Sequence, residues 1–146
     1  MQIELKIEEG CTDPKVIIIT DRMTDSINRA INILSENTPE MLAGFRDDAA
    51  EVISPHDIFR IYACDGKTIA VINDKEYYLR LRLYEAEEKL GVYDFVRISN
   101  SELVNLKKVK KFDMSLSGTI CVSMTDGTVT YVSRRYVKKI KQILGI

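Results

Sequence analysis

Apolar and polar residues alternate in short runs along most of the chain, which is the pattern of strands with one buried face. The runs predict strands at Val52–Ile53, Ile58–Ala63, Lys67–Ile72, Tyr77–Leu79, Phe95–Ile98, Leu103–Leu106, Val109–Phe112, Thr119–Met124 and Val129–Val132. Turn residues separate several runs, and Asp65–Gly66 and Asp126–Gly127 are hairpin signals. We therefore predict a mainly β fold, α+β overall, in which strands outnumber helices.

Two helices interrupt or end this β pattern. Apolar residues three and four positions apart predict a short helix at Arg82–Leu90, and Gly91 is suited to end it. Ser133 is the predicted N-cap of a C-terminal helix. The apolar face of that helix comprises Tyr136, Val137, Ile140, Ile143 and Leu144.

The N-terminal segment has a different pattern. Gln2–Glu8 alternates apolar and charged residues, and Lys15–Thr20 is a β-branched run, so we predict two strands that could form a hairpin. Thr24 is the predicted N-cap of a helix whose apolar stripe comprises Ile27, Ala30, Ile31 and Leu34. Such a unit is too small to hold its own core, so it must pack on the following domain or on another copy of the chain. A homodimer through this extension is therefore an open alternative.

A connector is predicted at Asn37–Asp48, because this segment contains Pro39, Gly44 and paired acids. We expect a short turn of helix around Glu40–Phe45. The predicted domains are accordingly a strand-strand-helix extension with its connector at 1–48 and a β domain at 49–146.

Composition narrows the class of protein. Apolar residues make up 45% of the chain and charged residues 29%, as in ordinary folded proteins, and even an apolar run such as Val16–Ile19 is too short for a membrane helix. We therefore expect a cytoplasmic protein. The three cysteines form no CxxC pair and His56 is the lone histidine, so neither a metal site nor a cofactor is expected. No nucleophile, phosphate-loop or HExxH motif favours an enzyme.

The charges are distributed unevenly. Residues 97–146 hold ten cations and three anions, a balance of +7, whereas residues 1–96 hold 11 cations and 19 anions, a balance of −8. Salt screens charges that lie more than roughly 8 to 10 Å apart, so a polyanion would respond to the basic part locally. The formal net charge of −1 therefore does not argue against DNA binding.

Three ordered segments carry a family resemblance: SPHDIFRIYACDGKTIAVI, FVRISNSELVNLKKVKKF and the terminal YVSRRYVKKIKQILGI. Together they resemble the LytTR DNA-binding domain of bacterial transcription regulators, from Val52 to Ile146. The resemblance implies an elongated arrangement of short antiparallel sheets that inserts loops into successive major grooves. A receiver domain needs on the order of a hundred residues, and far fewer precede Val52, so we expect a regulator without a receiver domain. We accordingly interpret Asp21 as a helix-entry residue rather than a phosphoacceptor.

The resemblance also implies which residues contact DNA. The base-contacting positions fall on Lys67, Asn100 and Arg135. Asn pairs with adenine and Arg with guanine in the major groove, so the residue types suit the role. Predicted phosphate contacts are Ser99, Ser101, Ser133, Arg134, Lys108 and Lys138. For the lysines at 107–111, a role as solvated edge-strand residues that prevent aggregation is an equal alternative.

The predicted function is sequence-specific binding of double-stranded DNA by a transcription regulator. The alternative is a protein-interaction module that docks on a membrane-bound or basic partner, with incidental basic charge at its C-terminal end. Family members are often encoded beside a small membrane protein that restrains them, so such an inhibitor is an expected partner.

Overall fold

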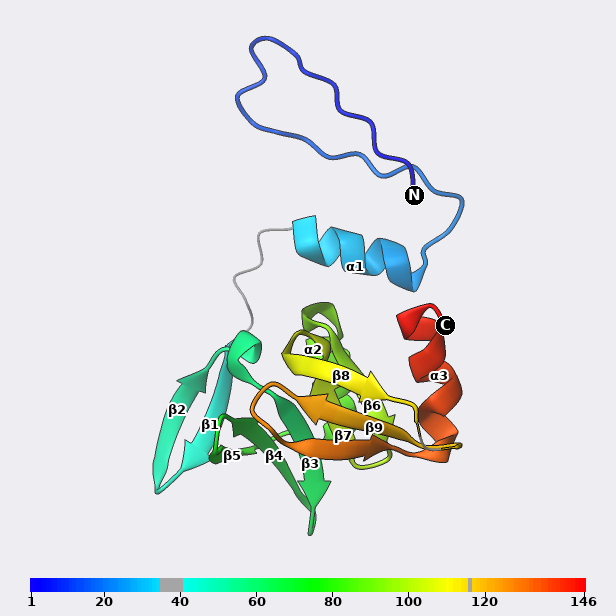
Figure 1. Cartoon of the computed structure of the whole chain (residues 1–146). Coiled ribbons are helices and arrows are strands. Elements are labelled where there is room, and N and C mark those ends of the chain that lie inside the picture. Colours follow the sequence, from blue (N-terminus) through cyan, green and yellow to red (C-terminus); the bar gives the residue numbers. More distant parts are fainter. Residues whose placement is uncertain (35–40, 116) are drawn as a thin grey trace.

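The computed structural model describes residues 1–34, 41–115 and 117–146. Two antiparallel sheets form its body (Figure 1). The larger sheet has the strand order β2-β1-β5-β4-β3-β7-β6, and the smaller has the order β10-β9-β8. The strands are β1 (Leu42–Arg46), β2 (Ala49–Ile53), β3 (Arg60–Cys64), β4 (Lys67–Ile72), β5 (Lys75–Leu79), β6 (Phe95–Ser99), β7 (Glu102–Asn105), β8 (Val109–Asp113), β9 (Ile120–Met124) and β10 (Val129–Val132).

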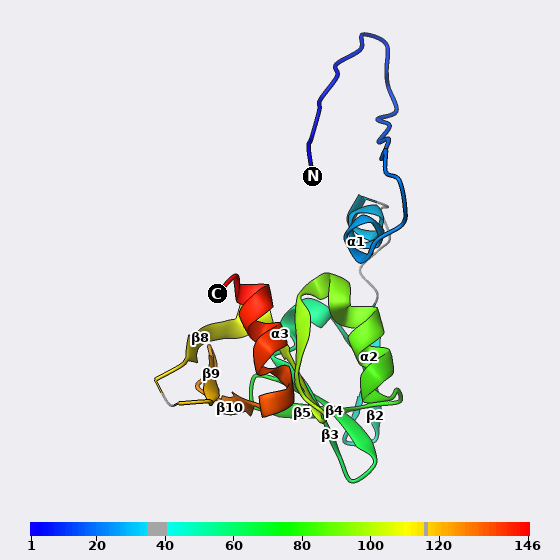
Figure 2. The same ribbon diagram turned by 90° about the vertical axis from the view of Figure 1, so that its right-hand side faces the viewer.

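Three helices and three short turns complete the described part of the chain (Figure 2). They are α1 (Asp25–Leu34), α2 (Leu83–Leu90) and α3 (Arg134–Leu144), with short 3-10 turns η1 (Pro55–Asp57), η2 (Gly91–Tyr93) and η3 (Leu106–Lys108). Helix α2 packs on one face of the larger sheet. Helix α3 and the smaller sheet pack on the other face.

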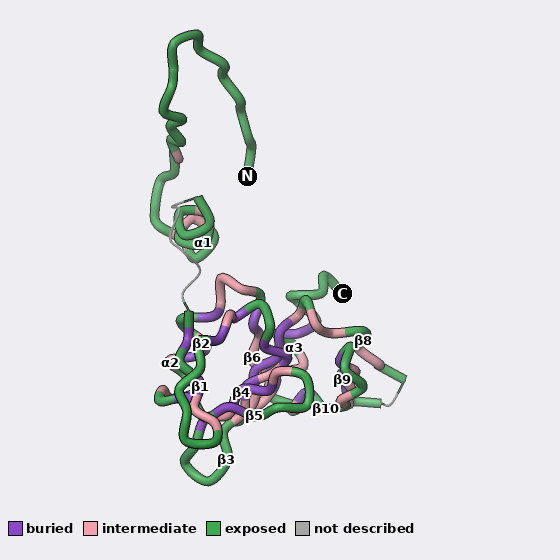
Figure 3. Tube along the Cα trace, turned by 90° about the vertical axis from the view of Figure 1, so that its left-hand side faces the viewer, coloured by how far each residue is buried: buried purple, intermediate pink, exposed green. Residues whose placement is uncertain are grey.

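The larger sheet is therefore buried on both faces near its β6 edge. Leu103 and Val104 are neighbours in β7 and point to opposite faces, yet neither is exposed at all. Leu103 belongs to the core under α2, whereas Val104 belongs to the core shared with β9, β10 and α3. Figure 3 shows the buried segments concentrated in this region. This double burial explains why β7 lacks a clean apolar and polar alternation.

The predicted strands from Val52 onward all coincide with or overlap observed strands, and β4 has the predicted bounds. The predicted end of α2 at Leu90 and the N-cap position of Ser133 are confirmed, but three details of these helices differ from the prediction. Gly91 does not end α2 in a left-handed conformation: its φ is −55°, the chain continues into η2, and Asp94 takes the left-handed conformation at φ 64°. Ser133 is the N-cap residue of α3, but its side chain makes no capping hydrogen bond. Ile143 and Leu144 are 42% and 37% exposed, because the apolar contact of α3 ends at the fully buried Ile140.

The N-terminal extension differs more from its prediction. Helix α1 is confirmed, and Thr24 Oγ1 accepts the Ile27 N–H at 3.3 Å as an N-cap should. The strands predicted at Gln2–Glu8 and Lys15–Thr20 were wrong: residues 1–24 contain no strand. A strand needs a partner for its ladder, and the two runs do not pair with each other within one chain. No residue of α1 is buried.

The predicted connector was wrong where the structure describes it. Residues 37–40 lie outside the described ranges, but the turn of helix expected around Glu40–Phe45 is instead strand β1, which pairs with β2 and β5. Gly44 is needed there for packing, since a Cβ at this position would lie 2.0 Å from Ile53 Cδ1. The larger sheet thus begins before residue 49, and the β1–β2 turn falls at Asp47 and Asp48, both at positive φ.

Candidate nucleic-acid interface

A two-residue loop, Asn100–Ser101, joins β6 to β7. The register of this strand pair shifts between Arg97 and Ser99, so Ile98 is the extra residue of a β-bulge. Bulges bend the strand locally and re-aim the residues that follow. Ser99 Oγ accepts the Ser101 N–H at 3.2 Å and lies 3.3 Å from Ser101 Oγ. The predicted phosphate-contacting serines therefore also shape the loop that carries Asn100.

Arg97 supports this loop from inside the protein. Its Nε donates to the Ser99 carbonyl at 2.8 Å and its Nη2 donates to the Asn100 carbonyl at 2.5 Å. Its Nη1 lies 2.6 Å from Glu87 Oε2 on α2, so the guanidinium is neutralised. The Arg97 side chain is 14% exposed. One arginine therefore fixes two consecutive loop carbonyls and ties the loop to α2.

The structure brings Asn100 and Arg135 together. The Asn100 Oδ1 accepts a hydrogen bond from Tyr136 Oη at 3.1 Å and a longer one from Arg135 Nη1 at 3.4 Å. The start of α3 is held beside the loop because the Ser133 N–H donates to the Ile98 carbonyl at 2.8 Å. Two predicted base-contacting side chains thus lie side by side on the surface.

Lys67 lies at the tip of the neighbouring β3–β4 hairpin. Asp65 and Gly66 form its turn, with φ of 50° and 75°. The Ala63 N–H donates to the Ser101 carbonyl at 2.8 Å, which fixes this hairpin beside the β6–β7 loop. One surface therefore carries Lys67, the Asn100–Ser101 loop and the start of α3. We call this surface the loop face.

The predicted phosphate contacts on α3 fall on this surface or next to it. Arg134 is exposed in the first turn of α3 and Lys138 is exposed one turn later. The first turn of α3 contains no acidic residue, so its two arginines oppose the helix dipole. An external anion at this helix start would relieve that repulsion. A shallow hollow beside them is lined by Arg134, Val137, Lys138, Lys141, Gln142 and Ile146.

Lys108 lies elsewhere. It ends η3, which follows the end of β7 opposite the loop, and β7 alone spans roughly 13 Å at the usual rise per strand residue. Its ammonium group lies 5.0 Å from the centre of the Phe59 ring, within the range of a cation–π interaction. The structure therefore does not bring Lys108 together with the loop face.

The acid that follows the loop is neutralised internally. Glu102 Oε1 lies 3.1 Å from Arg60 Nη1, and its Oε2 accepts the Thr130 hydroxyl at 2.8 Å. These contacts join β7 to β3 and to β10 of the smaller sheet. Because Glu102 is paired and only 12% exposed, its charge repels a polyanion little.

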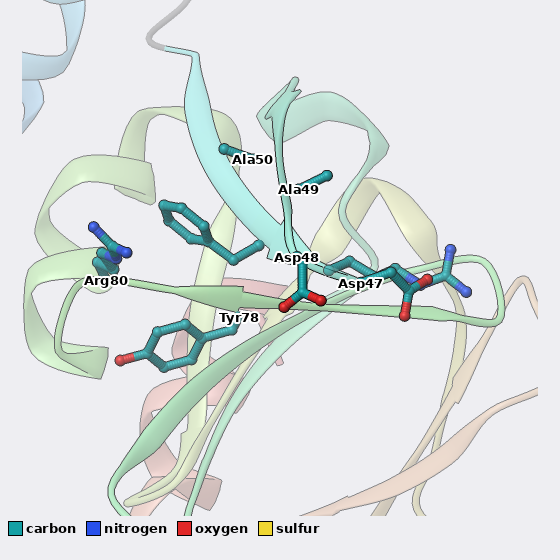
Figure 4. A pocket seen from close by; sticks show the side chains of 8 residues that line it. Asp47, Asp48, Ala49, Ala50, Tyr78 and Arg80 are labelled. Carbon is teal, nitrogen blue, oxygen red and sulfur yellow. The ribbon is translucent and has the colours of Figure 1, made fainter.

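A second hollow, at the β1–β2 hairpin, carries charges of both signs, two arginines and two aspartates (Figure 4). It is lined by Phe45, Arg46, Asp47, Asp48, Ala49, Ala50, Tyr78 and Arg80. The Arg80 guanidinium carbon lies 4.2 Å from the centre of the Phe45 ring, so this cation makes a cation–π interaction within the protein. Strands β1 and β2 form the edge of the larger sheet opposite β6. This hairpin is therefore separate from the loop face.

Sequence reasoning missed three residues that hold the loop face in place: Arg97, Glu87 and Tyr136. Arg97 entered only as one of ten cations, and Tyr136 only as part of an apolar helix face. The ring of Tyr136 does pack on the core, but its hydroxyl reaches Asn100. No local pattern signals such contacts, because Glu87 and Tyr136 approach the loop only through the tertiary fold.

Within the described ranges, none of the helices combines the length and apolarity needed to cross a membrane.

Comparison with known proteins identifies the family. The sequence family described as "LytTr DNA-binding domain" matches residues 48–145 of this chain. Proteins named "Uncharacterized HTH-type transcriptional regulator" from Staphylococcus aureus strains NCTC 8325 and N315 are each 31% identical over 147 residues, covering 100% of this chain and 99% of theirs. The LytTr DNA-binding domain of a methyl-accepting/DNA response regulator from Bacillus cereus has the same fold, with a TM-score of 0.69 at 23% identity, covering 73% of this chain and 97% of that one. The chain belongs to the family of LytTr DNA-binding domains.

Proposed function

We propose that the protein is a sequence-specific transcription regulator that binds double-stranded DNA through the loop face. One observation carries the proposal: Asn100 Oδ1 accepts hydrogen bonds from both Arg135 and Tyr136. It brings an amide and a guanidinium, the groups suited to adenine and guanine, to one exposed point. In the proposed complex Arg135 leaves Asn100 for a guanine, and Tyr136 continues to orient the amide.

The order of the elements supports a contact through loops. Helices α2 and α3 are separated in the chain by five strands, β6 to β10, so they do not form a helix-turn-helix pair. Asn100 and Arg135 would contact one major groove, and Lys67 at the hairpin tip would approach the neighbouring groove. Ser99, Ser101, Ser133, Arg134 and Lys138 would contact phosphates around them, with Lys108 as an outlying contact.

The test compares specific with scrambled DNA. A duplex selected from a random pool and its scrambled counterpart would be titrated by fluorescence anisotropy at one salt concentration. Asn100→Ala and Arg135→Ala should each weaken binding to the specific duplex by about 1 to 3 kcal/mol and hardly change binding to the scrambled one. Equal losses on both duplexes would mean that these residues contact phosphates only.

The N-terminal extension supports a second proposal, that of a homodimer. It exposes many apolar side chains, and the Staphylococcus aureus relatives match over the whole chain, so the extension is shared with them. A small membrane protein that restrains the regulator, as the family resemblance suggested, would compete for the same apolar segment. We place the protein in the cytoplasm, where it would meet DNA.

A further inference from the structure

The N-terminal segment of the extension presents its apolar residues to solvent. Ile3, Leu5 and Ile7 are 83 to 88% exposed, and they alternate with the charged residues Glu4 and Lys6. The segment reaches away from the two sheets and from α1 in Figures 1 and 2. It therefore has the pattern of a strand with one buried face while contributing to neither sheet of its own chain.

The exposed apolar area matches that of a protein interface. Eight large apolar side chains among residues 1–24 are more than 60% exposed: Met1, Ile3, Leu5, Ile7, Val16, Ile17, Ile19 and Met23. At about 25 cal/mol per Å², such side chains each present roughly 60 to 120 Å² of apolar surface. Eight of them give roughly 500 to 1,000 Å² over residues 1–24, against the ~800 Å² that one partner contributes to an ordinary stable interface. Ile3, Leu5 and Ile7 supply roughly 180 to 360 Å² of this area.

We propose that residues 2–8 of two copies of this chain pair as antiparallel strands centred on Leu5. This inference deepens the homodimer put forward under the proposed function. In that register Leu5 faces Leu5 of the second copy, Ile3 faces Ile7, and Glu4 faces Lys6. Each Lys6, which contacts Glu8 of its own chain at 2.6 Å, gains a cross-strand acid. Two identical ion pairs form, as the two-fold symmetry of such an interface requires.

Charge complementarity selects this register over its neighbours. An antiparallel pair centred on Lys6 would place Glu4 opposite Glu8, and one centred on Glu4 would place that acid opposite itself. A parallel in-register pair would place Glu4 opposite Glu4 and Lys6 opposite Lys6. Like charges directly opposite destabilise a strand pair, so the pairing centred on Leu5 is the favourable one.

The symmetry of the pairing allows a sharp test by charge exchange in the full-length chain. Glu4→Lys places lysines opposite each other at two positions of the dimer, and Lys6→Glu does the same with acids. The double variant carrying both changes restores two opposite pairs. Asp13→Lys makes the same charge change as Glu4→Lys outside the paired residues and serves as the control.

Sedimentation equilibrium without DNA should show a wild-type dimer. Each single variant should dissociate more readily, by about 2- to 30-fold for the two ion pairs lost, and the double variant should recover the wild-type constant. The Asp13→Lys control should match wild type.

Any of three results would overturn this pairing. The wild-type chain could be monomeric, the single variants could dimerise as tightly as wild type, or the double variant could keep the weakened dimerisation of the single variants. Because DNA is absent from the measurement, a monomer that still discriminates between duplexes would refute the pairing alone. A dimer that fails to discriminate would refute the DNA-binding proposal alone.

Discussion

Replacing Arg97 with methionine removes the support beneath the Asn100 loop while keeping an unbranched side chain of similar length. The change deletes two hydrogen bonds to loop carbonyls and the 2.6 Å contact with Glu87. Hydrogen bonds to charged groups contribute about 1.5 to 3 kcal/mol each. The loop is exposed, so water can replace part of the loss, and we expect a stability loss of about 2 to 3 kcal/mol. At about 4 °C per kcal/mol, the melting temperature should fall by about 10 °C.

The effect on DNA binding should be selective. If the loop is no longer held, Asn100 loses its base contact, which costs about 1 to 3 kcal/mol, or about 5- to 150-fold, on the specific duplex. Binding to a scrambled duplex should change by less than about 2-fold, because the Arg97 guanidinium is engaged by the loop carbonyls and Glu87 and is not itself placed to contact phosphate. Both titrations belong well below the melting temperature of the variant, where circular dichroism shows a folded chain.

Two further variants separate charge from geometry. Arg97→Lys keeps the cation but cannot bond both carbonyls and Glu87 with fixed geometry, so it should lose specificity almost as far as methionine does. Glu87→Gln removes the ion pair and leaves the carbonyl bonds, so most of the specificity should remain. A lysine variant with full discrimination, or a methionine variant that weakens equally on both duplexes, would refute the positioning role of Arg97.

The remaining predictions concern the loop face and its charges. Tyr136→Phe removes one hydrogen bond to Asn100 but keeps the packed ring, so discrimination should fall by about 0.5 to 1.5 kcal/mol in the duplex titration with little change in melting temperature. Affinity measured over a salt series should give a slope of log K against log salt near −4 or −5, and a slope near zero would exclude the basic surface as the contact. Lys138→Ala should lower binding to both duplexes and flatten that slope by about one unit. Lys108→Ala should do the same if this lysine meets a phosphate, but should also lower the melting temperature through loss of the Phe59 contact.

The sequence predicted the elements whose signal is local. Strand β4 was placed residue by residue because its alternation and its flanking turns lie within a few positions. The bounds of the helices were likewise close, since helical spacing and caps are short-range features. Gly44 shows where such reasoning fails: a glycine in a segment rich in acids indicates a turn, yet here it makes room for Ile53 from the adjacent strand. The need for a glycine came from a pairing that the local pattern does not encode.

The same limit applies to the extension and to the site. The run Gln2–Glu8 has the alternation of a strand, but alternation specifies only one buried face, not the partner that completes a ladder. The base-contacting positions Lys67, Asn100 and Arg135 were placed by resemblance, and their contact with DNA stays a prediction. Their mutual arrangement depends on the Ile98 bulge and on the Ser133 to Ile98 hydrogen bond, neither of which has a sequence signature.

Counting charges in the sequence overstates the number of cations available to DNA. Three of the ten cations between residues 97 and 146 contact acids within the protein: Arg97 and Lys139 contact Glu87, and Lys107 contacts Asp94. Others belong to η3 and β8, away from the loop. Apart from Lys139, the exposed cations of α3 and Lys67 make up the remaining basic group, on the loop face and along α3: Arg134, Arg135, Lys138, Lys141 and Lys67. Neutralising about five phosphates gives a slope near −4.5, at roughly −0.9 per phosphate. A slope steeper than about −7 would mean that the lysines of β8 also contact DNA, and that the bound surface extends onto the smaller sheet.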